Sequence, residues 1–354
     1  MTMSAMATAT IMDASKYQCP NCQNGHWQIS STDWICQDCG QRYSCVEGIP
    51  RLYLESRIGP QDQRLRDRFY NSLLGRYYQY LMPFLSLPVR PARASWKGWV
   101  AYALIVVFLV TLVGMLARIV YSPDGGRVSA LDIGVVLLSV LLAYGSFRHP
   151  HLFYLILLAI PVRISILLRG FTPAESFTDI HARVIDDFLK KDGKLQVLDI
   201  STGTCNSLYR HGWMKLNADY TGLDLSEVML RQGQMFMAQQ RIPMEFVLAD
   251  ATRLPFRADT FDIVLNYGAV NGVSDPQRAL DEMARVARKG GLVLFLDEQL
   301  YQPASFVERL YFRSVLSRHN VIHRCPIELM PRSLELVTVH QVYQFYYLCT
   351  SYKA

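Results

Sequence analysis

Apolar and polar residues follow two patterns along the second half of the chain, one typical of strands and one typical of helices. Short runs rich in branched and aromatic residues predict buried strands at 196–200, 220–224, 245–249, 261–266 and 292–296. Between these runs, apolar residues recur at helical spacing and predict helices near 206–217, 226–240 and 275–288, the last closed by Gly290-Gly291. The tail "LELVTVHQVYQFYYLCTSYK" predicts a closing antiparallel pair. Alternating strands and helices indicate an α/β fold, with a doubly wound parallel sheet over residues 172–354.

A long apolar block precedes this region. Residues 99–117, "WVAYALIVVFLVTLVGMLA", carry no charge, and as a helix they would be roughly 28 Å long, against about 30 Å of hydrocarbon in a bilayer. A second run at 130–147 follows a polar turn. The pair predicts a transmembrane helical hairpin, with buried helices of a soluble domain as the alternative. Residues 151–170 contain Pro161 and Arg163, which favours an interfacial helix over a third span.

Charge suggests how the chain is oriented. Residues 51–97 carry nine Arg or Lys against three acids, and the positive-inside rule then predicts an integral membrane protein with both flanking domains on the cytoplasmic side. Residues 56–98 would be a basic, aromatic linker close to the membrane. Residues 1–16 have no signal-peptide pattern and are expected to be a disordered tail. The net charge of +6 is modest and gathers beside the apolar block, so nucleic acid is not an expected partner.

Two CxxC pairs mark a small unit at residues 17–55. Cys19 and Cys22 are followed, after thirteen residues, by Cys36 and Cys39. Each pair forms a tight turn that presents two thiolates, and four thiolates suit a structural Zn²⁺ ion. Two redox or disulfide pairs are the alternative, and Cys45 lies outside the pattern.

The stretch "VLDISTGTCNSL" predicts a strand, a small-residue turn and a helix start. It lacks the GxGxxG pattern of dinucleotide loops, which argues against a nicotinamide cofactor. A ligand without phosphates needs one close backbone approach, which Gly203 can supply. Ser201 and Cys205 add little bulk over glycine, provided that their φ angles are negative.

Polar residues follow the predicted strands at the edge where ligands bind in such sheets. Asp199 can order the loop or meet an ammonium group, Asp224 can accept both ribose hydroxyls, and Asp250 can accept an adenine amino group. Asn266 ends the fourth strand. Together they predict an adenosine ligand with a charged amino-acid tail, S-adenosylmethionine.

Residues 195 to about 300 resemble the class I S-adenosylmethionine-dependent methyltransferases, especially the quinone and sterol C-methylating group. The matching strings include "VLDISTGTCNSL", "YTGLDLSEVML" and "DPQRALDEMARVARKGGLVLF". The resemblance implies a Rossmann-like, seven-stranded sheet. The family loop runs D-x-G-x-G-x-G, whereas this chain has Ser201 and Cys205 at two of the glycines. The residues implied in cofactor binding are Asp199, Ser201, Thr202, Gly203, Cys205, Asp224, Leu225, Asp250, Ala251, Asn266 and Tyr267. The N-terminal unit resembles the zinc ribbons that precede or partner some methyltransferases.

The apolar block narrows the expected substrate. A catalytic domain held at a bilayer would meet lipid-dissolved molecules, so the leading hypothesis is methylation of a prenylated quinol, a phenol or another lipid. The alternatives are an RNA or protein methyltransferase that reads its substrate through the ribbon, and an inactive adenosyl-binding scaffold. Tyr267, Asn271, Asp275 and His323 are candidate bases, and no spacing singles one out. The acceptor atom and the oligomeric state stay open.

Overall fold

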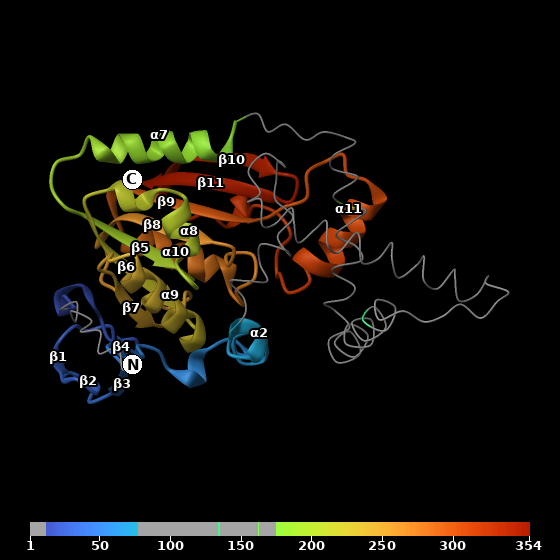
Figure 1. The fold of residues 1–354 in the computed structure, drawn as a ribbon. Coiled ribbons are helices and arrows are strands. Elements are labelled where there is room, and N and C mark those ends of the chain that lie inside the picture. Colours follow the sequence, from blue (N-terminus) through green and yellow to red (C-terminus); the bar gives the residue numbers. More distant parts are fainter. Residues whose placement is uncertain (1–11, 77–133, 135–161, 163–174) are drawn as a thin grey trace. The chain divides into compact units, whose positions relative to one another are not determined.

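The computed structural model describes residues 12–76, 134, 162 and 175–354 (Figure 1). Apart from the two single positions, the expected spans at 99–117 and 130–147 and the interfacial helix at 151–170 lie outside the described residues. Within the described ranges, no helix has the length and apolar character needed to cross a bilayer. The chain divides into two compact units, one of Met1–Gln79, Thr172–Pro303 and Leu316–Ala354, the other of Tyr80–Phe171 and Ala304–Val315.

The first unit contains a seven-stranded sheet in the order β10-β11-β9-β8-β5-β6-β7. Its strands are β5 Leu195–Ile200, β6 Ala218–Asp224, β7 Glu245–Leu248, β8 Phe261–Tyr267, β9 Ala287–Glu298, β10 Leu334–Tyr343 and β11 Tyr346–Lys353. Strands β5 to β9 are parallel, and β10 and β11 pair antiparallel at one edge. The expectations of a Rossmann-like α/β sheet and of a closing antiparallel pair are confirmed.

Four helices connect or flank these strands: α7 Phe177–Leu189, α8 Asn206–Arg210, α9 Glu227–Gln239 and α10 Pro276–Val286. α8 is shorter than the expected 206–217, because Gly212 adopts a left-handed φ of 84° and a 3-10 turn follows at Trp213–Lys215. Gly290-Gly291 does not close α10. These glycines lie in an irregular start of β9, where Phe261 pairs with Ala287 and Ile263 with Leu292.

Apolar side chains form two clusters on opposite faces of the sheet. Neighbouring residues of β5 separate in this way, Val197 into one cluster and Leu198 into the other, as alternation along a strand requires. The apolar face of α7, including Ile180 and Val184, covers the Val197 face.

An N-terminal module, residues 12–58, belongs to the same unit as the sheet. Its strands β1 Trp27–Ile29, β2 Asp33–Cys36, β3 Arg42–Val46 and β4 Ile49–Pro50 form an antiparallel sheet. β4 lies against the edge strand β7, and Arg51 forms a parallel bridge with Leu248 (Figure 1). Tyr17 and Trp34 are fully or almost fully buried in the same cluster as Val247 of β7. The module therefore shares a core with the larger sheet.

A buried ion pair fastens this module to the sheet. Lys16 Nζ lies 2.7 Å from Glu245 Oε2 and also donates to Thr221 Oγ1 at 2.9 Å. The Tyr17 hydroxyl donates to Glu245 Oε2 at 2.9 Å. Residues 12–16 of the expected disordered tail are thus ordered, with a 3-10 turn at Ala14–Lys16.

In the second unit, the described stretch Ala304–Val315 contains α11, Phe306–Tyr311. The Ser305 hydroxyl accepts from the Glu308 N–H, and the Glu308 carboxylate accepts from the Ser305 N–H at 2.7 Å, so a capping box starts the helix.

The ion pair gives the first testable prediction. Lys16→Ala leaves Glu245 buried without its cation, so we expect the free energy of unfolding to fall by about 3–5 kcal/mol in urea titrations followed by circular dichroism. The matched control is Lys190→Ala, which removes an exposed pair with Asp187 and should cost less than about 1 kcal/mol. Equal losses of unfolding free energy in the two variants would contradict a stabilising role for the buried ion pair.

Candidate functional site

The strand β5 lies at the topological switch point of the sheet, where the strand order reverses. Its neighbours are β6 on one side and β8 on the other, and the chain continues outward from each. Asp199 stands opposite Gly222 of β6 and Leu265 of β8, so the carboxyl ends of all three strands meet at one edge. Ligands bind at this position in open α/β sheets. Asp199, Asp224 and Asn266 therefore share the edge expected from their positions in the sequence.

The loop after β5 has an unusual backbone. Ser201, Gly203 and Cys205 all adopt left-handed conformations, with φ of 56°, 53° and 60°. The condition that Ser201 and Cys205 have negative φ is not met. Each non-glycine residue in this region costs on the order of 1–2 kcal/mol, so the surrounding structure must hold the loop in place.

Hydrogen bonds to β5 and β6 hold the loop. The Thr202 N–H donates to the Leu223 carbonyl at 2.9 Å, and the Thr202 hydroxyl donates to Asp199 Oδ2 at 2.5 Å. The Gly203 N–H donates to Asp224 Oδ2 at 2.9 Å. Asp199 and Asp224 therefore stabilise the loop by accepting hydrogen bonds from it, as well as lying beside it.

Two glycines outside the loop let it approach β6 and α9 closely. A Cβ on Gly222 would lie 2.9 Å from Thr202 Cγ2. A Cβ on Gly233 would lie 2.9 Å from the Gly203 carbonyl oxygen and 2.8 Å from Cys205 Sγ. Cys205 is fully buried in this contact. Neither glycine falls within the loop pattern, so the sequence analysis missed both.

Asp199 is almost fully buried, and its Oδ1 atom has no hydrogen-bond partner among the described residues. Burial, with a smaller contribution from the charge of Asp224, raises the pKa of Asp199 to about 7. An unpaired buried acceptor of this kind suits a cationic donor such as an ammonium group.

Asp224 uses both of its oxygens to shape the edge. Oδ1 accepts from the Ser226 N–H at 2.8 Å, and Oδ2 accepts from the Gly203 N–H. Burial raises the pKa of Asp224 to about 6, against these hydrogen bonds, which favour the carboxylate. Each oxygen keeps a second lone pair, so the carboxylate can accept two hydroxyl groups.

Asp250 lies two residues beyond the end of β7 and is 5% exposed. Its Oδ1 atom accepts from both the N–H and the hydroxyl of Thr252, at 2.8 and 2.9 Å. Its Oδ2 atom is buried and has no partner among the described residues. Burial raises the pKa of this carboxyl group. Ala251, the next residue, is also buried.

At the end of β8, Tyr267 belongs to a polar and aromatic cluster. Trp213 Nε1 donates to the Tyr267 hydroxyl at 2.7 Å, and His181 Nε2 lies 2.8 Å from the same oxygen. His181 Nδ1 lies 2.9 Å from the Phe177 carbonyl and must carry the proton, so Nε2 accepts from Tyr267 when the ring is neutral. The His211 ring lies 5.2 Å from that of Tyr267.

Both imidazoles of this cluster are neutral near pH 7. Burial lowers the pKa of His181 to about 4 and that of His211 to about 3. The sequence analysis missed both histidines. The apolar spacing of the helix at 177–189 places His181 on its buried face, but that signal alone does not distinguish a site residue from a core residue.

Three of the remaining sequence candidates have structural partners. The Asn266 side chain accepts from the Ala269 N–H at 3.1 Å. Asn271 is fully buried and bonds to Glu298 and Tyr347, and Asp275 caps α10 by accepting from the Arg278 N–H. His323 is exposed.

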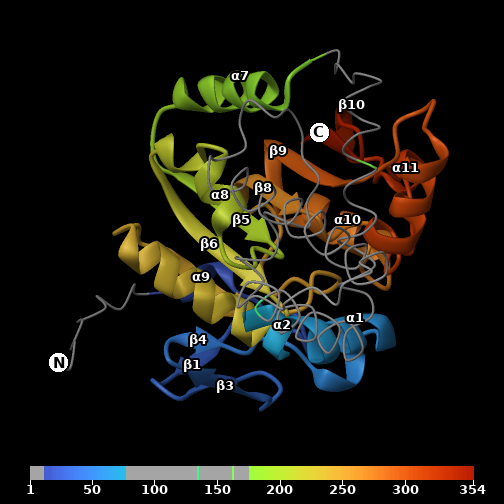
Figure 2. The ribbon, with the colours of Figure 1, turned by 45° about the vertical axis from the view of Figure 1, so that its right-hand side comes forward.

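Residues 56–76 of the expected linker pack along the same edge. Asp62 of α1, Pro60–Leu65, accepts from the Ser274 N–H at 3.0 Å, beyond β8. Asn71 accepts from the Ser226 hydroxyl at 2.7 Å, beyond β6. The short helix α2, Leu73–Arg76, lies beside α9 (Figure 2). The segment therefore contacts the loops after β6 and after β8, on both sides of the topological switch point.

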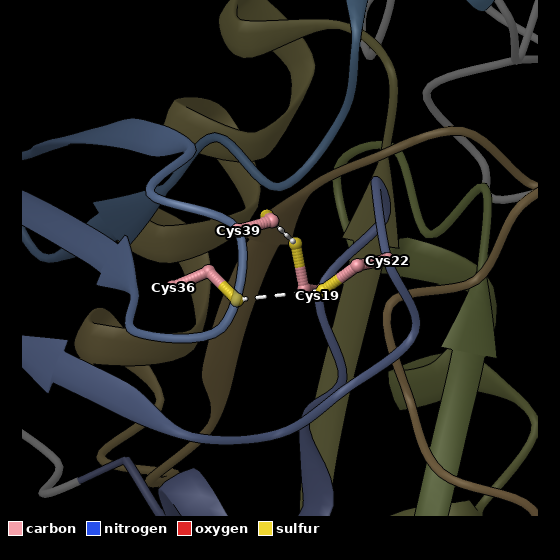
Figure 3. Close-up of side chains that lie close together, drawn as sticks. All are labelled: Cys19, Cys22, Cys36 and Cys39. Atoms are coloured by element: carbon pink, nitrogen blue, oxygen red, sulfur yellow. Dashed lines mark hydrogen bonds between the residues drawn. The ribbon is translucent and has the colours of Figure 1, made fainter.

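The four cysteines of the module converge (Figure 3). Their sulfur atoms all lie within 4.8 Å of one another, with Cys19 3.7 Å from Cys39 and Cys22 3.6 Å from Cys36. Tetrahedral Zn–S bonds of about 2.3 Å place sulfur atoms about 3.8 Å apart, so the geometry is compatible with zinc. Cys45 of β3 lies outside the group.

Comparison with known proteins agrees with this geometry. Residues 198–295 match a family model described as a methyltransferase domain. The chain carries a class I S-adenosylmethionine-dependent methyltransferase domain. It is 27% identical over 161 residues to a ubiquinone/menaquinone biosynthesis C-methyltransferase of Campylobacter jejuni, covering 43% of this chain and 67% of that protein. It is 35% identical over 96 residues to a demethylmenaquinone methyltransferase of Renibacterium salmoninarum, covering 27% and 38%.

Solved structures of methyltransferases also match. One is the Haemonchus contortus phosphoethanolamine N-methyltransferase 2 in complex with S-adenosyl-L-methionine. That match has 14% identity and a TM-score of 0.41, and it covers 49% of this chain and 52% of the other.

The strained loop of the methyltransferase domain gives a second prediction. Glycine at position 201 relieves a positive φ, so Ser201→Gly should raise the free energy of unfolding by about 1 kcal/mol. Ser207→Gly is the control, because Ser207 lies in α8 and glycine there should lower stability by about 0.5 kcal/mol. Urea titrations of both variants measure the difference, and a destabilised Ser201→Gly would refute the assignment of strain.

Proposed function

We propose that this protein is a membrane-anchored methyltransferase that transfers a methyl group from S-adenosylmethionine to a lipophilic small molecule, a prenylated quinol, phenol or other lipid. The observation that carries the proposal is the similarity of the methyltransferase domain to a ubiquinone/menaquinone biosynthesis C-methyltransferase and to a demethylmenaquinone methyltransferase. A quinol carbon is electron-rich, and the sulfonium methyl group is already activated. The protein then needs mainly to align the two in a dry site.

The proposed cofactor site follows the edge of the sheet. The unpaired Asp199 oxygen would accept from the ligand ammonium group, and Asp224 would accept the ribose hydroxyls. Asp250 with Ala251 would bind the adenine, and Asn266 with Tyr267 would flank the methionine end. The loop residues Ser201, Thr202, Gly203 and Cys205 would present backbone to the ligand, and Leu225 would lie beside the ribose.

The cluster beside Tyr267 would position that residue and would not accept a proton. Methylation at a quinol carbon requires the loss of a proton, and an efficient general base has a pKa near the working pH. Burial lowers the pKa of His181 to about 4 and that of His211 to about 3, so both are weak bases at pH 7. His181 and Trp213 would instead hold the Tyr267 hydroxyl in place beside the methionine end.

The apolar block and the cysteine group complete the proposal. Residues 99–117 and 130–147 would anchor the protein in a membrane, with residues 151–170 at its surface and both domains on the cytoplasmic side. Residues 17–55 would be a zinc ribbon in which Cys19, Cys22, Cys36 and Cys39 hold a structural ion. All four ligands are thiolates, so the metal would supply folding energy and no open coordination position.

The decisive test combines cofactor binding with the fate of the methyl group. We expect the detergent-solubilised full chain to bind S-adenosylhomocysteine in calorimetry, and Asp224→Ala to weaken binding roughly 10- to 100-fold by removing charged hydrogen-bond acceptors. Asp219→Ala is the control, because Asp219 lies on the same strand but pairs with Lys194. With radiolabelled S-adenosylmethionine, label should enter extracted lipid.

Other outcomes identify the alternatives. Label that stays with RNA or protein would favour a macromolecular substrate, for which the ribbon would be the reader. Binding of S-adenosylhomocysteine with no label transferred to any acceptor would favour the inactive adenosyl-binding scaffold, and no binding by the intact protein would end the enzymatic proposal.

Metal analysis tests the ribbon separately. We expect about one zinc ion per chain in the purified protein, and a clear loss of zinc in Cys39→Ser, because one of four thiolate ligands is removed. Cys45→Ser should keep its zinc, since Cys45 lies outside the group. Equal zinc contents in the two variants would contradict the proposed ligand set.

A further inference from the structure

The carboxyl end of β9 carries two acids, Asp297 and Glu298, to which the proposed cofactor site gives no role. β9 pairs in parallel with β8 (Figure 2), so this end lies on the same edge of the sheet as Asn266 and Tyr267. The acids assigned to S-adenosylmethionine follow β5, β6 and β7, on the other side of β8. The β9 side of the edge is therefore the part left for the methyl acceptor.

Glu298 starts from the same face of the sheet as Tyr267. Tyr267 stands opposite Leu296 in the ladder between β8 and β9, and residues two apart on a strand share a face. Glu298 continues β9 by two residues and still pairs with Tyr346 of β11. With about 4.8 Å between strands and about 3.3 Å per residue, the Cα atoms of Tyr267 and Glu298 are about 8 Å apart. Both side chains can therefore contact one small acceptor at this edge.

Asp297 and Glu298 have different surroundings although they are neighbours. Asp297 is 1% exposed, and its carboxylate accepts from the N–H groups of Asn271 and Glu298, both at 2.8 Å. Glu298 is partly exposed, and its carboxyl group accepts from Asn320 Nδ2 at 3.0 Å. The two N–H donors stabilise Asp297 as an anion, so Glu298 is the member of the pair that takes up a proton.

The two carboxyl groups also act on each other. Burial, together with the charge of Asp297 and a hydrogen bond to it, raises the pKa of Glu298 well above its ordinary value. The titratable groups that face the pair from other elements are the Tyr347 hydroxyl on β11 and the Cys325 thiol, and both are neutral near pH 7 because their pKa values are raised. Among the described residues, neither acid is paired with a Lys, Arg or His side chain. The Glu298 carboxylate is therefore a stronger base than an exposed glutamate.

We propose that Glu298 is the general base of the methyl transfer and accepts the proton that the ring carbon of the acceptor loses. The inference rests on the proposed function, which requires an acceptor that loses a proton and assigns no residue to take it. Asp297 is a positioning residue. Its fixed carboxylate accepts a hydrogen bond from Glu298 once Glu298 is protonated, which favours the transfer.

The step balances without a further reactant. An electron pair of the quinol ring forms the new bond between the ring carbon and the methyl group, and the electrons of the broken S–C bond remain on sulfur. The ring carbon then gives its proton to the Glu298 carboxylate, and the electrons of the C–H bond restore the aromatic ring. Because Glu298 is partly exposed, it can release the proton to solvent afterwards.

Turnover of the detergent-solubilised full chain tests the base, with radiolabelled S-adenosylmethionine and a prenylated naphthoquinol that has one unsubstituted ring carbon as the probe. Glu298→Gln keeps the shape of the side chain but cannot accept the proton, so kcat should fall at least about 100-fold. The KM for the quinol and the affinity for S-adenosylhomocysteine should stay within about threefold of the wild type. The matched control is Glu335→Gln, which changes an exposed glutamate of β10 and should leave kcat unchanged.

The pH profile gives a measurement that a purely structural role would not move. Only ionised Glu298 accepts a proton, so kcat of the wild type should rise with pH as Glu298 ionises and then level off. Asp297→Asn removes the neighbouring negative charge and lowers the pKa of Glu298, so the rise should move to lower pH.

The outcomes separate this inference from the proposed function. If the wild type methylates the quinol and Glu298→Gln does so at the same rate, the base is refuted and the function stands. A folded Asp297→Asn variant whose pH profile matches the wild type refutes it as well. If Asp297→Asn does not fold, the comparison of Glu298→Gln with Glu335→Gln decides, with thermal midpoints confirming that both are folded. If the wild type transfers no label to the quinol, the proposed function falls and the inference falls with it.

Discussion

The contact between Lys16 and Glu245 decides how the first compact unit is organised. Glu245 begins β7, the edge strand of the methyltransferase sheet, and an open edge leaves backbone groups without partners. The N-terminal module covers that edge through β4 and the Arg51 bridge. Because the ion pair is buried, neither charge can lose its partner without a large cost. The module is therefore built into the methyltransferase fold at the strand that precedes Asp250.

Much of the sheet was predictable because its signal is local. The runs at 196–200 and 261–266 carry branched apolar residues on both faces, and such runs form central parallel strands. Boundaries were less certain where one residue interrupts the pattern, as Gly212 does in ending α8 early. The backbone of the loop could not be inferred at all. Residue types suggest that Ser201 and Cys205 avoid positive φ, whereas in the folded loop, which packs closely against Gly222 and Gly233, both adopt it.

The candidate site was likewise predictable only in part. Asp199, Asp224 and Asp250 were found because a residue that follows a strand in a parallel sheet is placed by topology alone. Their raised pKa values were not foreseeable, since they come from burial by segments distant in sequence. His181 and His211 were missed because α7 and the turn after α8 meet Tyr267 only in three dimensions.

These acids also explain what kind of ligand the edge favours. Burial holds the pKa of Asp199 near 7 and that of Asp224 near 6, so without a ligand the edge retains protons that exposed aspartates would release. A positively charged ligand nearby favours the ionised form and lowers both pKa values. Ligand binding and proton release would then be linked, and a ligand with more positive charge would favour the ionised carboxylates more strongly. S-adenosylmethionine carries a sulfonium charge that S-adenosylhomocysteine lacks, so under the proposed function the buried acids would interact more favourably with the methyl donor than with the spent product.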